Sequence, residues 1–257
     1  MDKILIVKIG GNLINNSHVL NRFLKSFAKI ETKKILIHGG GNQVTKMCKK
    51  LNVDVKIRNG RRITSIQDLE VATMIYAGSL NKTLVTKLQS FNCNSIGLSG
   101  ADANLIESVK RPVKEIDYGL VGDIKKINSI FLKNLIDQNL TPVICSITHD
   151  KNGQLLNTNA DTVSSEIAIS LSKYYTVNLI YCHEKNGVLS NQNDDNSTFD
   201  KLNEKEFNNY LELKIISNGM IPKLTNSFYA LNNGVKSVKI AGQSLDEQNM
   251  KSTIITN

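Results

Sequence analysis

Short apolar runs alternate along the chain with longer stretches in which apolar residues recur every three or four positions. The short runs are typical of buried strands, and the longer stretches are typical of helices. The predicted strands are 3–8, 34–38, 94–98, 142–147, 176–182 and 235–240. The predicted helices are 17–29, 42–51, 66–90, 129–138, 160–173, 203–212 and 220–232. This alternation predicts an α/β fold, a three-layer αβα sandwich with a mainly parallel central sheet.

The helix predicted at 66–90 has the clearest periodicity, and the segments that interrupt the alternation predict loops and hairpins. The apolar positions of that helix are Leu69, Ala72, Ile75, Leu80, Leu84 and Leu88. Between 99 and 128 the pattern breaks into short turns, which predicts hairpins that project from the sheet. A second set of strands and helices begins after residue 174. We therefore expect two lobes, residues 1–174 and residues 175–257.

Two predicted strands end in glycines and are each followed by a polar helix start. Residues 3–13 read KILIVKIGGNL, and residues 33–46 read KKILIHGGGNQVTK. Backbone N–H groups at such a turn are suited to hold an anion. An isolated glycine run is more often a tight turn without a ligand, but here the arrangement occurs twice and places Lys8 at a strand end. The two common nucleotide-binding glycine patterns are absent, so any phosphate site uses a different arrangement.

Two later segments place polar residues at the starts of predicted helices. QLLNTNAD ends at Asp161, in the first turn of a helix, where a carboxylate is favourable on electrostatic grounds alone. Asn157 and Asn159 alternate before it and point the same way if the segment is extended. ISNGMIPK ends at Lys223, also in a first helical turn. A cation is unfavourable there, which indicates that Lys223 serves a ligand rather than the helix.

Composition and charge exclude several functional classes. The chain of 257 residues is 40% apolar and 21% charged, with no apolar run near the roughly 20 residues of a membrane span. Met1 stands two residues before the first predicted strand, so we expect no signal peptide. The histidines have no metal-ligand spacing, so we expect no protein-held metal. The cysteines form no C-x-x-C pair, which favours reduced core residues in a cytoplasmic protein; they are Cys48, Cys93, Cys145 and Cys182.

A net charge of +9 raises the question of nucleic-acid binding. Such binding usually needs basic residues gathered on one face, often with aromatic side chains that stack on bases. Here the basic residues are spread along the chain, aromatic residues make up 5%, and there is no tryptophan. A basic enzyme that handles ATP and an acidic metabolite fits the same charge. We therefore expect small-molecule partners and no nucleic acid.

Six motifs together resemble the amino acid kinase family, which has the carbamate kinase-like fold. The resemblance is to its acetylglutamate kinase branch, in the form found in Bacteroidetes, whose hairpin here reads KRPVKEIDYGLVGDI. The motifs follow the family's order over nearly the whole chain. They are VKIGG (7–11), HGGG (38–41), NGRRIT (59–64), NKTL (81–84), LLNTNAD (155–161) and NGMIPK (218–223).

The resemblance implies an activity and a set of catalytic residues. Enzymes of this branch transfer the γ-phosphoryl group of ATP, with Mg²⁺ bridging the ATP phosphates, to the side-chain carboxylate of N-acetyl-L-glutamate in arginine biosynthesis. Such a transfer needs positioning and charge neutralisation more than covalent chemistry. Lys8 and Lys223 match the two lysines that balance charge in the transition state. Asp161 matches the carboxylate that orients both of them.

The resemblance also implies which residues bind the two substrates. Arg62 matches the residue that grips the α-carboxylate of the acylated glutamate, Gly40 and Gly41 offer N–H groups to that substrate, and Asn157 matches a further contact. The chain reads Glu-Lys-Asn at 184–186 where many relatives have Asp-Val-Ser or similar. The residues expected to bind ATP or its phosphates are Gly10, Gly11, Glu184, Gly187, Leu189, Ser217 and Asn218.

Two alternatives remain open at this point. The same reaction on N-succinyl-L-glutamate, or less readily on a carrier-bound aminoadipate, would need only a small change near the hairpin. A catalytically silent protein of this fold could instead sense a metabolite. The intact set of Lys8, Asp161 and Lys223 argues against the silent protein.

The resemblance further implies an assembly. In this family, enzymes inhibited by arginine carry an additional N-terminal helix that joins dimers into a hexameric ring. Here the first predicted strand follows Met1 almost at once, so we expect that helix to be absent. We therefore expect a homodimer that is indifferent to arginine, built partly on Leu69, Ile75 and Leu80 of the helix at 66–90.

Overall fold

The computed structural model of the chain describes residues 1–58, 60–216, 219–245 and 250–257. Among these residues, eight strands form one large sheet in the order β12-β14-β13-β11-β1-β2-β8-β5. Neighbouring strands in it are parallel except for the β13–β14 pair. The strands are β1 (Lys3–Ile9), β2 (Lys33–His38), β5 (Ser95–Leu98), β8 (Thr141–Cys145), β11 (Thr176–Cys182), β12 (Lys201–Asn203), β13 (Ser237–Ala241) and β14 (Ser252–Thr256). The predicted mainly parallel sheet is confirmed.

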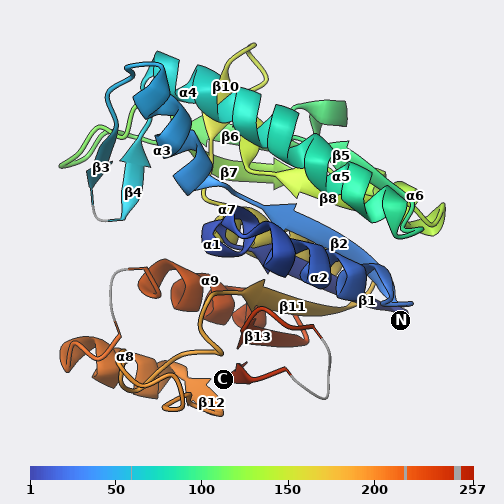
Figure 1. The fold of residues 1–257 in the computed structure, drawn as a ribbon, viewed down its shortest axis with the longest axis vertical. Coiled ribbons are helices and arrows are strands. Elements are labelled where there is room, and N and C mark those ends of the chain that lie inside the picture. The colour runs from blue at the N-terminus through green and yellow to red at the C-terminus, as the bar shows by residue number, and fades with distance from the viewer. Residues whose placement is uncertain (59, 217–218, 246–249) are drawn as a thin grey trace.

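Helices cover both faces of this sheet, which gives the predicted three layers (Figure 1). The helices α8 and α9 lie at one end of the molecule, and α3 and α4 lie at the other, beside the β3–β4 hairpin. The helices are α1 (Gly11–Asn15), α2 (Ser17–Ala28), α3 (Gly41–Lys50), α4 (Ile66–Thr73), α5 (Asn81–Ser90), α6 (Ser129–Asp137), α7 (Ala160–Leu171), α8 (Glu204–Glu212) and α9 (Ile221–Asn232), with a π-helix η1 (Met74–Leu80) and a 3₁₀ turn η2 (Asp102–Asn104).

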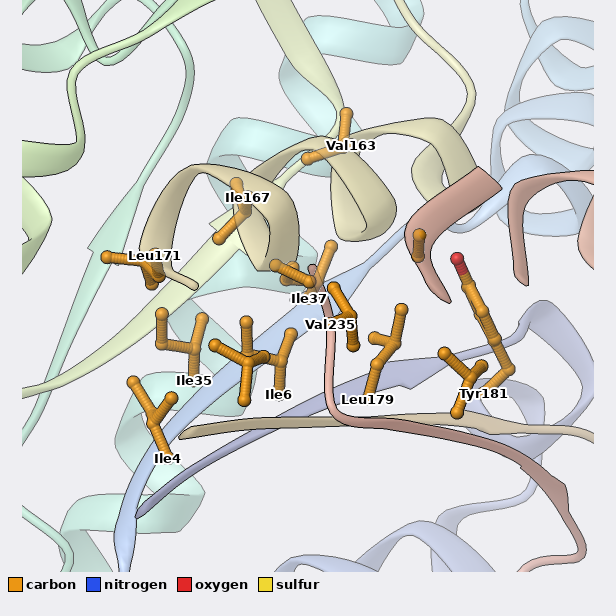
Figure 2. Close-up of a cluster of buried hydrophobic side chains, with 14 of the residues drawn as sticks. Ile4, Ile6, Ile35, Ile37, Val163, Ile167, Leu171, Leu179, Tyr181 and Val235 are labelled. Carbon is orange, nitrogen blue, oxygen red and sulfur yellow. The ribbon is translucent and has the colours of Figure 1, made fainter. Parts of the chain in front are cut away.

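Alternation along β1 shows how the sequence builds both faces. Ile4 and Ile6 belong to one buried cluster, and Val7 and Ile9 belong to the other, because successive side chains in a strand point to opposite faces. Figure 2 shows the first cluster, in which isoleucines of β1 and β2 lie beneath α7. Its labelled members on these three elements are Ile4, Ile6, Ile35, Ile37, Val163, Ile167 and Leu171. Lys8 shares the face of Ile4 and Ile6, and therefore also lies on the α7 side.

The smaller sheets hold the hairpins that the broken pattern predicted. A four-stranded sheet has the order β10-β9-β6-β7, and β3 and β4 form a separate hairpin. The single strand predicted at 142–147 is instead two strands, β8 and β9, which belong to different sheets. The short strands β3, β4, β10 and β12, and the terminal β14, were not predicted. The strands of the two smaller sheets are β3 (Lys56–Arg58), β4 (Arg61–Ile63), β6 (Ile106–Lys110), β7 (Gly122–Ile127), β9 (Ile147–His149) and β10 (Leu155–Asn157).

The long helix predicted at 66–90 is continuous but contains a π-helical segment, η1, between α4 and α5. Its apolar positions step by three or four residues except between Ile75 and Leu80, where the step is five. A π-helix bonds each residue to one five positions away, so this step keeps both side chains on the buried face. The irregular spacing and the π-helix are therefore the same feature.

The residues expected at a dimer contact are buried inside the chain itself. Leu69, Ile75 and Leu80 are only 5%, 8% and 4% exposed. The prediction that these three side chains form the contact is therefore wrong, because they already pack against the sheet. On the outer side of the same helix, Ile66 and Met74 are 69% and 62% exposed.

The proposed boundary between lobes falls within a continuous sheet. Strand β11 begins just after residue 174 and pairs with β1 along its whole length, from Thr176 opposite Lys3 to Cys182 opposite Ile9. The division at 174/175 stays a prediction.

The four cysteines are free and buried, as expected for reduced core residues. Within the described ranges, no helix is long and apolar enough to cross a membrane.

Candidate active site

Lys8, Asp161 and Lys223 come together in the structure, as the sequence predicted. The Nζ atom of Lys8 lies 2.7 Å from Oδ1 of Asp161, and the Nζ atom of Lys223 lies 3.1 Å from the same oxygen. All three residues are buried, at 8%, 8% and 4% exposed. A buried carboxylate between two ammonium groups is stable only because each charge is paired. We refer to these residues as the Lys8–Asp161–Lys223 cluster.

Each member of the cluster is placed by a different element. Lys8 is the next residue after Ile6 on the face of β1 that α7 covers. Asp161 lies in the first turn of α7, where the side chain of Asn159 accepts the backbone N–H of Asp161 at 2.7 Å and so fixes the start of the helix. Lys223 lies in the first turn of α9, with its ammonium group 5.3 Å from the ring centroid of Tyr181.

The cluster changes the ionisation of its members. Burial alone would raise the pKa of Asp161, but attraction to Lys223 and Lys8 outweighs it and holds that pKa well below its ordinary value. Burial lowers the pKa of Lys223 to about 8, even though Asp161 attracts the proton. The like charge of Lys8 contributes to this lowering. Asp161 therefore stays ionised at neutral pH. Lys223 is mostly protonated at neutral pH but loses its proton as the pH rises through about 8.

The glycine run after β2 is held by buried side chains. The Nδ1 atom of His38 lies 3.0 Å from the carbonyl oxygen of Gly39, and Nε2 lies 3.1 Å from the amide nitrogen of Asn81. Because a carbonyl only accepts, Nδ1 must carry the proton, which leaves Nε2 to accept from Asn81. Burial lowers the pKa of His38 to about 4, so the neutral ring persists. The orientation of the Gly39 carbonyl is therefore fixed.

The position of Gly40 has no room for a side chain. Its φ of +148° lies in a region that L-residues rarely adopt, and a Cβ atom there would lie 2.8 Å from a methyl carbon of Leu80 and 3.1 Å from the ring of Tyr76. The turn can thus pack directly against η1. Gly41 follows as the first residue of α3, so its backbone N–H has no partner within the helix and is available to a ligand.

A cavity of about 340 Å³ adjoins the cluster and the glycine run. It brings together Lys8, Asp161 and the residues predicted to bind the acylated glutamate. Those residues are Gly40, Gly41, Arg62 and Asn157. Three arginines line it, Arg61, Arg62 and Arg111, so its charge suits a ligand with more than one negative group.

Arg62 and Asn157 are both held in place by neighbours. The guanidinium of Arg62 donates to Asp68 at 2.8 Å and to the hydroxyl of Thr45 at 2.5 Å. The amide of Asn157 donates to the hydroxyl of Thr64 at 3.1 Å. These contacts fix both side chains at the cavity wall before any ligand is bound.

A second cavity, of about 260 Å³, contains three of the residues predicted to bind the nucleotide. Glu184, Gly187 and Leu189 line it, together with Met220, which caps the helix that carries Lys223. Burial lowers the pKa of the lining residue His183 to about 4, and the charge of Lys223 lowers it further. The cluster is therefore close to both cavities.

The two glycines predicted to contact the phosphates of ATP are not part of the second cavity. Gly11 lines the first cavity rather than the second, and Gly10 precedes it as the N-cap of α1. Ser217 and Asn218 lie outside the described residues, so their predicted role stays a prediction. Across the described parts of the chain, no group of three or more His, Cys, Asp or Glu side chains could hold a metal ion.

Several residues of the first cavity were not predicted as site residues. Some of them, such as Arg61 and Asn159, belong to the six motifs but were given no role, and the fold brings the others to the cavity wall. Arg111 comes from the hairpin segment, Tyr76 from the long helix, and Asn159 was noticed only for its alternation with Asn157. Those that line the cavity without having been predicted are Ile9, Gly39, Asn42, Thr45, Ile57, Gly60, Arg61, Tyr76, Arg111, Val121, Ser146, Thr158, Asn159 and Ala160.

Comparison with known proteins agrees with this geometry. The amino acid kinase family matches residues 3–242. The acetylglutamate kinase of Bacteroides fragilis is 48% identical, over 93% of this chain and 92% of its own, and that of Cytophaga hutchinsonii is 49% identical, over 93% and 91%. The crystal structure of smu.665 from Streptococcus mutans has a TM-score of 0.83 at 26% identity, over 98% of both chains. Giardia lamblia carbamate kinase has a TM-score of 0.67 at 14% identity, over 99% of both chains, which shows the shared fold.

Proposed function

The chain belongs to the amino acid kinase family, and from its acetylglutamate kinase relatives we infer that it transfers the γ-phosphoryl group of ATP to the side-chain carboxylate of N-acetyl-L-glutamate. The product is an acyl phosphate, N-acetyl-L-glutamyl 5-phosphate, in arginine biosynthesis. The observation that carries this conclusion in the structure is the Lys8–Asp161–Lys223 cluster, close to both an arginine-lined cavity and a second cavity.

The reaction needs no general base. A side-chain carboxylate is ionised at neutral pH, so its oxygen can attack the γ-phosphorus directly while the bond from that phosphorus to the bridging oxygen of ADP breaks. Asp161 is the carboxylate among the described residues that line the first cavity. Its lowered pKa and its two lysine partners make it a poor proton acceptor. Its role is to position Lys8 and Lys223.

The two lysines act on the charge of the transferring group. In the transition state, negative charge lies on the equatorial oxygens and on the attacking and leaving oxygens. Lys8, on β1, and Lys223, on α9, place two ammonium groups against one carboxylate oxygen of Asp161. Both groups can stabilise that negative charge. Because their positions are fixed before reaction, little reorganisation is needed as the charge develops.

The acylated glutamate binds in the arginine-lined cavity. We assign its α-carboxylate to Arg62, whose planar fork can hold two oxygens, with Asn157 as a further contact. The N–H groups of Gly40 and Gly41, at the start of α3, face the same ligand. The cationic wall supports this assignment, since an N-acylglutamate carries two carboxylates.

ATP binds in the second cavity, with Glu184, Gly187 and Leu189 in its wall and Gly10 and Gly11 toward its phosphates. Mg²⁺, which would neutralise charge on the β- and γ-phosphates, arrives bound to ATP in this proposal. The protein's own cations then act on the remaining phosphate charge.

One observation favours N-succinyl-L-glutamate as a second candidate substrate. A further cavity of about 610 Å³ shares Arg61 and Arg111 with the first and adds Lys114. It also contains Glu115 and Asp123, and Asp123 already pairs with Arg111, which leaves Arg61 and Lys114 as its basic residues without that pairing. A succinyl group carries a third carboxylate, which these basic residues could accept. Turnover of the two acylglutamates, compared as kcat/KM with coupled detection of ADP, distinguishes them. A higher value for the N-acetyl compound supports the primary proposal, and a higher value for the N-succinyl compound replaces it.

Activity should decline at alkaline pH because Lys223 must be protonated to act. Its lowered pKa, about 8, means that the free enzyme loses this charge as pH rises through 8, so kcat/KM for ATP should fall above that pH. In the ATP complex the phosphates favour the charged lysine, and kcat should fall only at higher pH. Lys223→Arg, which keeps its charge throughout, should remove the alkaline decline from whatever activity remains. A decline that persists in this variant would assign it to another group.

Arg62→Lys should raise the KM for the acylglutamate about 10-fold or more and leave the KM for ATP near its original value. A lysine keeps the charge but cannot hold two carboxylate oxygens in one plane. Arg58→Lys, on the exposed surface of the same hairpin, is the matched control and should change neither constant. Equal damage to both KM values in Arg62→Lys would indicate a structural role through Asp68 instead.

The protein acts in the cytoplasm as a homodimer in this proposal. Four buried free cysteines support a reducing compartment. The exposed Ile66 and Met74 support a two-fold contact through the outer side of α4 and η1. Light scattering should give twice the mass of one chain, and Met74→Glu should shift the protein toward monomer. A monomer, or a dimer unaffected by Met74→Glu, would exclude this contact.

A further inference from the structure

Tyr76 is a buried residue of the substrate cavity that no motif singled out. It lies on the π-helix η1, is 5% exposed, and lines the arginine-rich cavity. Its hydroxyl makes no hydrogen bond within the described parts of the chain. The other two buried tyrosines do: Tyr175 donates to Asp137 at 2.9 Å, and Tyr181 donates to the backbone carbonyl of Asp161 at 3.1 Å. Tyr76 is thus the exception among three buried phenols.

The hydroxyl of Tyr76 lies beside the start of α3. The ring packs on the glycine turn, 3.1 Å from where a Cβ on Gly40 would be, and the hydroxyl is 3.8 Å from the corresponding position on Gly41. Arg62 is close to the same turn, since its guanidinium also donates to the carbonyl of Gly41 at 3.3 Å. A helix N-terminus, an arginine and a phenol therefore converge on one part of the cavity.

A hydroxyl in this position is suited to donate to an anion. Burial raises the pKa of Tyr76 to about 12, with Arg62 opposing the rise, so the phenol keeps its proton at neutral pH. The hydroxyl oxygen keeps access to the cavity, so a ligand oxygen there can accept its hydrogen. The charge of Arg62 and the backbone N–H of Gly41 at the start of α3 favour a carboxylate over a neutral group.

We propose that the Tyr76 hydroxyl donates a hydrogen bond to a carboxylate oxygen of the acylated glutamate, held at the start of α3, and that Tyr76 is a specificity-determining residue for that substrate. The assignment rests on the proposed function. A site that offers a fixed donor to one substrate oxygen discriminates against analogues that lack the oxygen, because the donor is then left unpaired.

Tyr76→Phe removes the hydroxyl and keeps the ring that packs on Gly40. The KM for the acylglutamate should rise about 10-fold, which is the usual effect of losing one hydrogen bond to a charged group. The KM for ATP and kcat should stay within about 2-fold. Stability to urea should be unchanged, since the hydroxyl makes no hydrogen bond within the described residues.

Tyr175→Phe is the matched control, because it makes the same chemical change in a buried tyrosine whose hydroxyl is paired and remote from the cavity. It should lower stability and leave all kinetic constants unchanged. An unchanged acylglutamate KM in Tyr76→Phe, or a loss of stability like that of Tyr175→Phe, overturns the role of Tyr76. If the unsubstituted protein phosphorylates no acylglutamate, the proposed function itself fails, which the same assay detects separately.

Discussion

Replacing Lys8 or Lys223 with alanine should lower kcat by about 10² or more while the KM values change much less. The structure gives the reason: both ammonium groups are fixed on one carboxylate oxygen, at 2.7 and 3.1 Å, and meet charge that develops only during transfer. Steady-state kinetics with saturating ATP and acylglutamate measures the effect.

Lys239→Ala is a suitable control for the lysine variants. Lys239 lies in β13 of the same sheet, at a position that pairs with Ile180 and so faces away from Lys8, which pairs with Tyr181. This variant should keep its kcat. A Lys8 or Lys223 variant with unchanged kcat would remove that lysine from the mechanism.

Replacing Asp161 with asparagine should damage both folding and catalysis. The variant leaves two buried cations without an anion, and breaking a buried ion pair by removing one partner is unfavourable by about 3–5 kcal/mol. Because the pKa of Asp161 is lowered in the folded state, its stabilising effect is complete above the ordinary aspartate pKa of about 4 and is lost as pH falls below it. Urea unfolding at several pH values measures the difference from the unsubstituted protein.

The pH dependence of the difference in unfolding free energy distinguishes a charge role of Asp161 from a packing role. The stability gap should be full at neutral pH and should narrow as pH falls below about 4. Asp54→Asn, which alters an exposed ion pair with Lys56, should change little at any pH. A gap at Asp161 that does not depend on pH would indicate a packing role rather than a charge role.

Local pattern explains why the Lys8–Asp161–Lys223 cluster could be predicted. Lys8 continues the alternation of Ile4 and Ile6, so its side chain lies on the same face of β1 as theirs, which α7 covers. The polar residues before Asp161 marked a helix start, and a cation in the first turn of α9 was locally unfavourable. Each signal was weak alone. The order of the motifs along the chain, which resembles that of the family, indicated that the three residues act together. The structure confirms that the three side chains meet.

Other features depend on contacts between distant segments, which periodicity does not reveal. The burial of Leu69, Ile75 and Leu80 follows from the sheet beneath them, so an apolar stripe alone could not distinguish a core face from a dimer face. The pairing of Arg62 with Asp68 depends on how the β3–β4 hairpin folds over α3 and α4. The five-residue step in the long helix was visible in the sequence and marked the segment that carries Tyr76.

In the proposed reaction the protein forms an acyl phosphate on an acylated glutamate. The most direct measurement traps this product with hydroxylamine while ADP release is followed in the same reaction with ATP, Mg²⁺ and N-acetyl-L-glutamate. The account predicts hydroxamate and ADP in equal amounts, with both lost in Lys8→Ala and Lys223→Ala. ADP release without hydroxamate, or no reaction with any acylated glutamate, would contradict it.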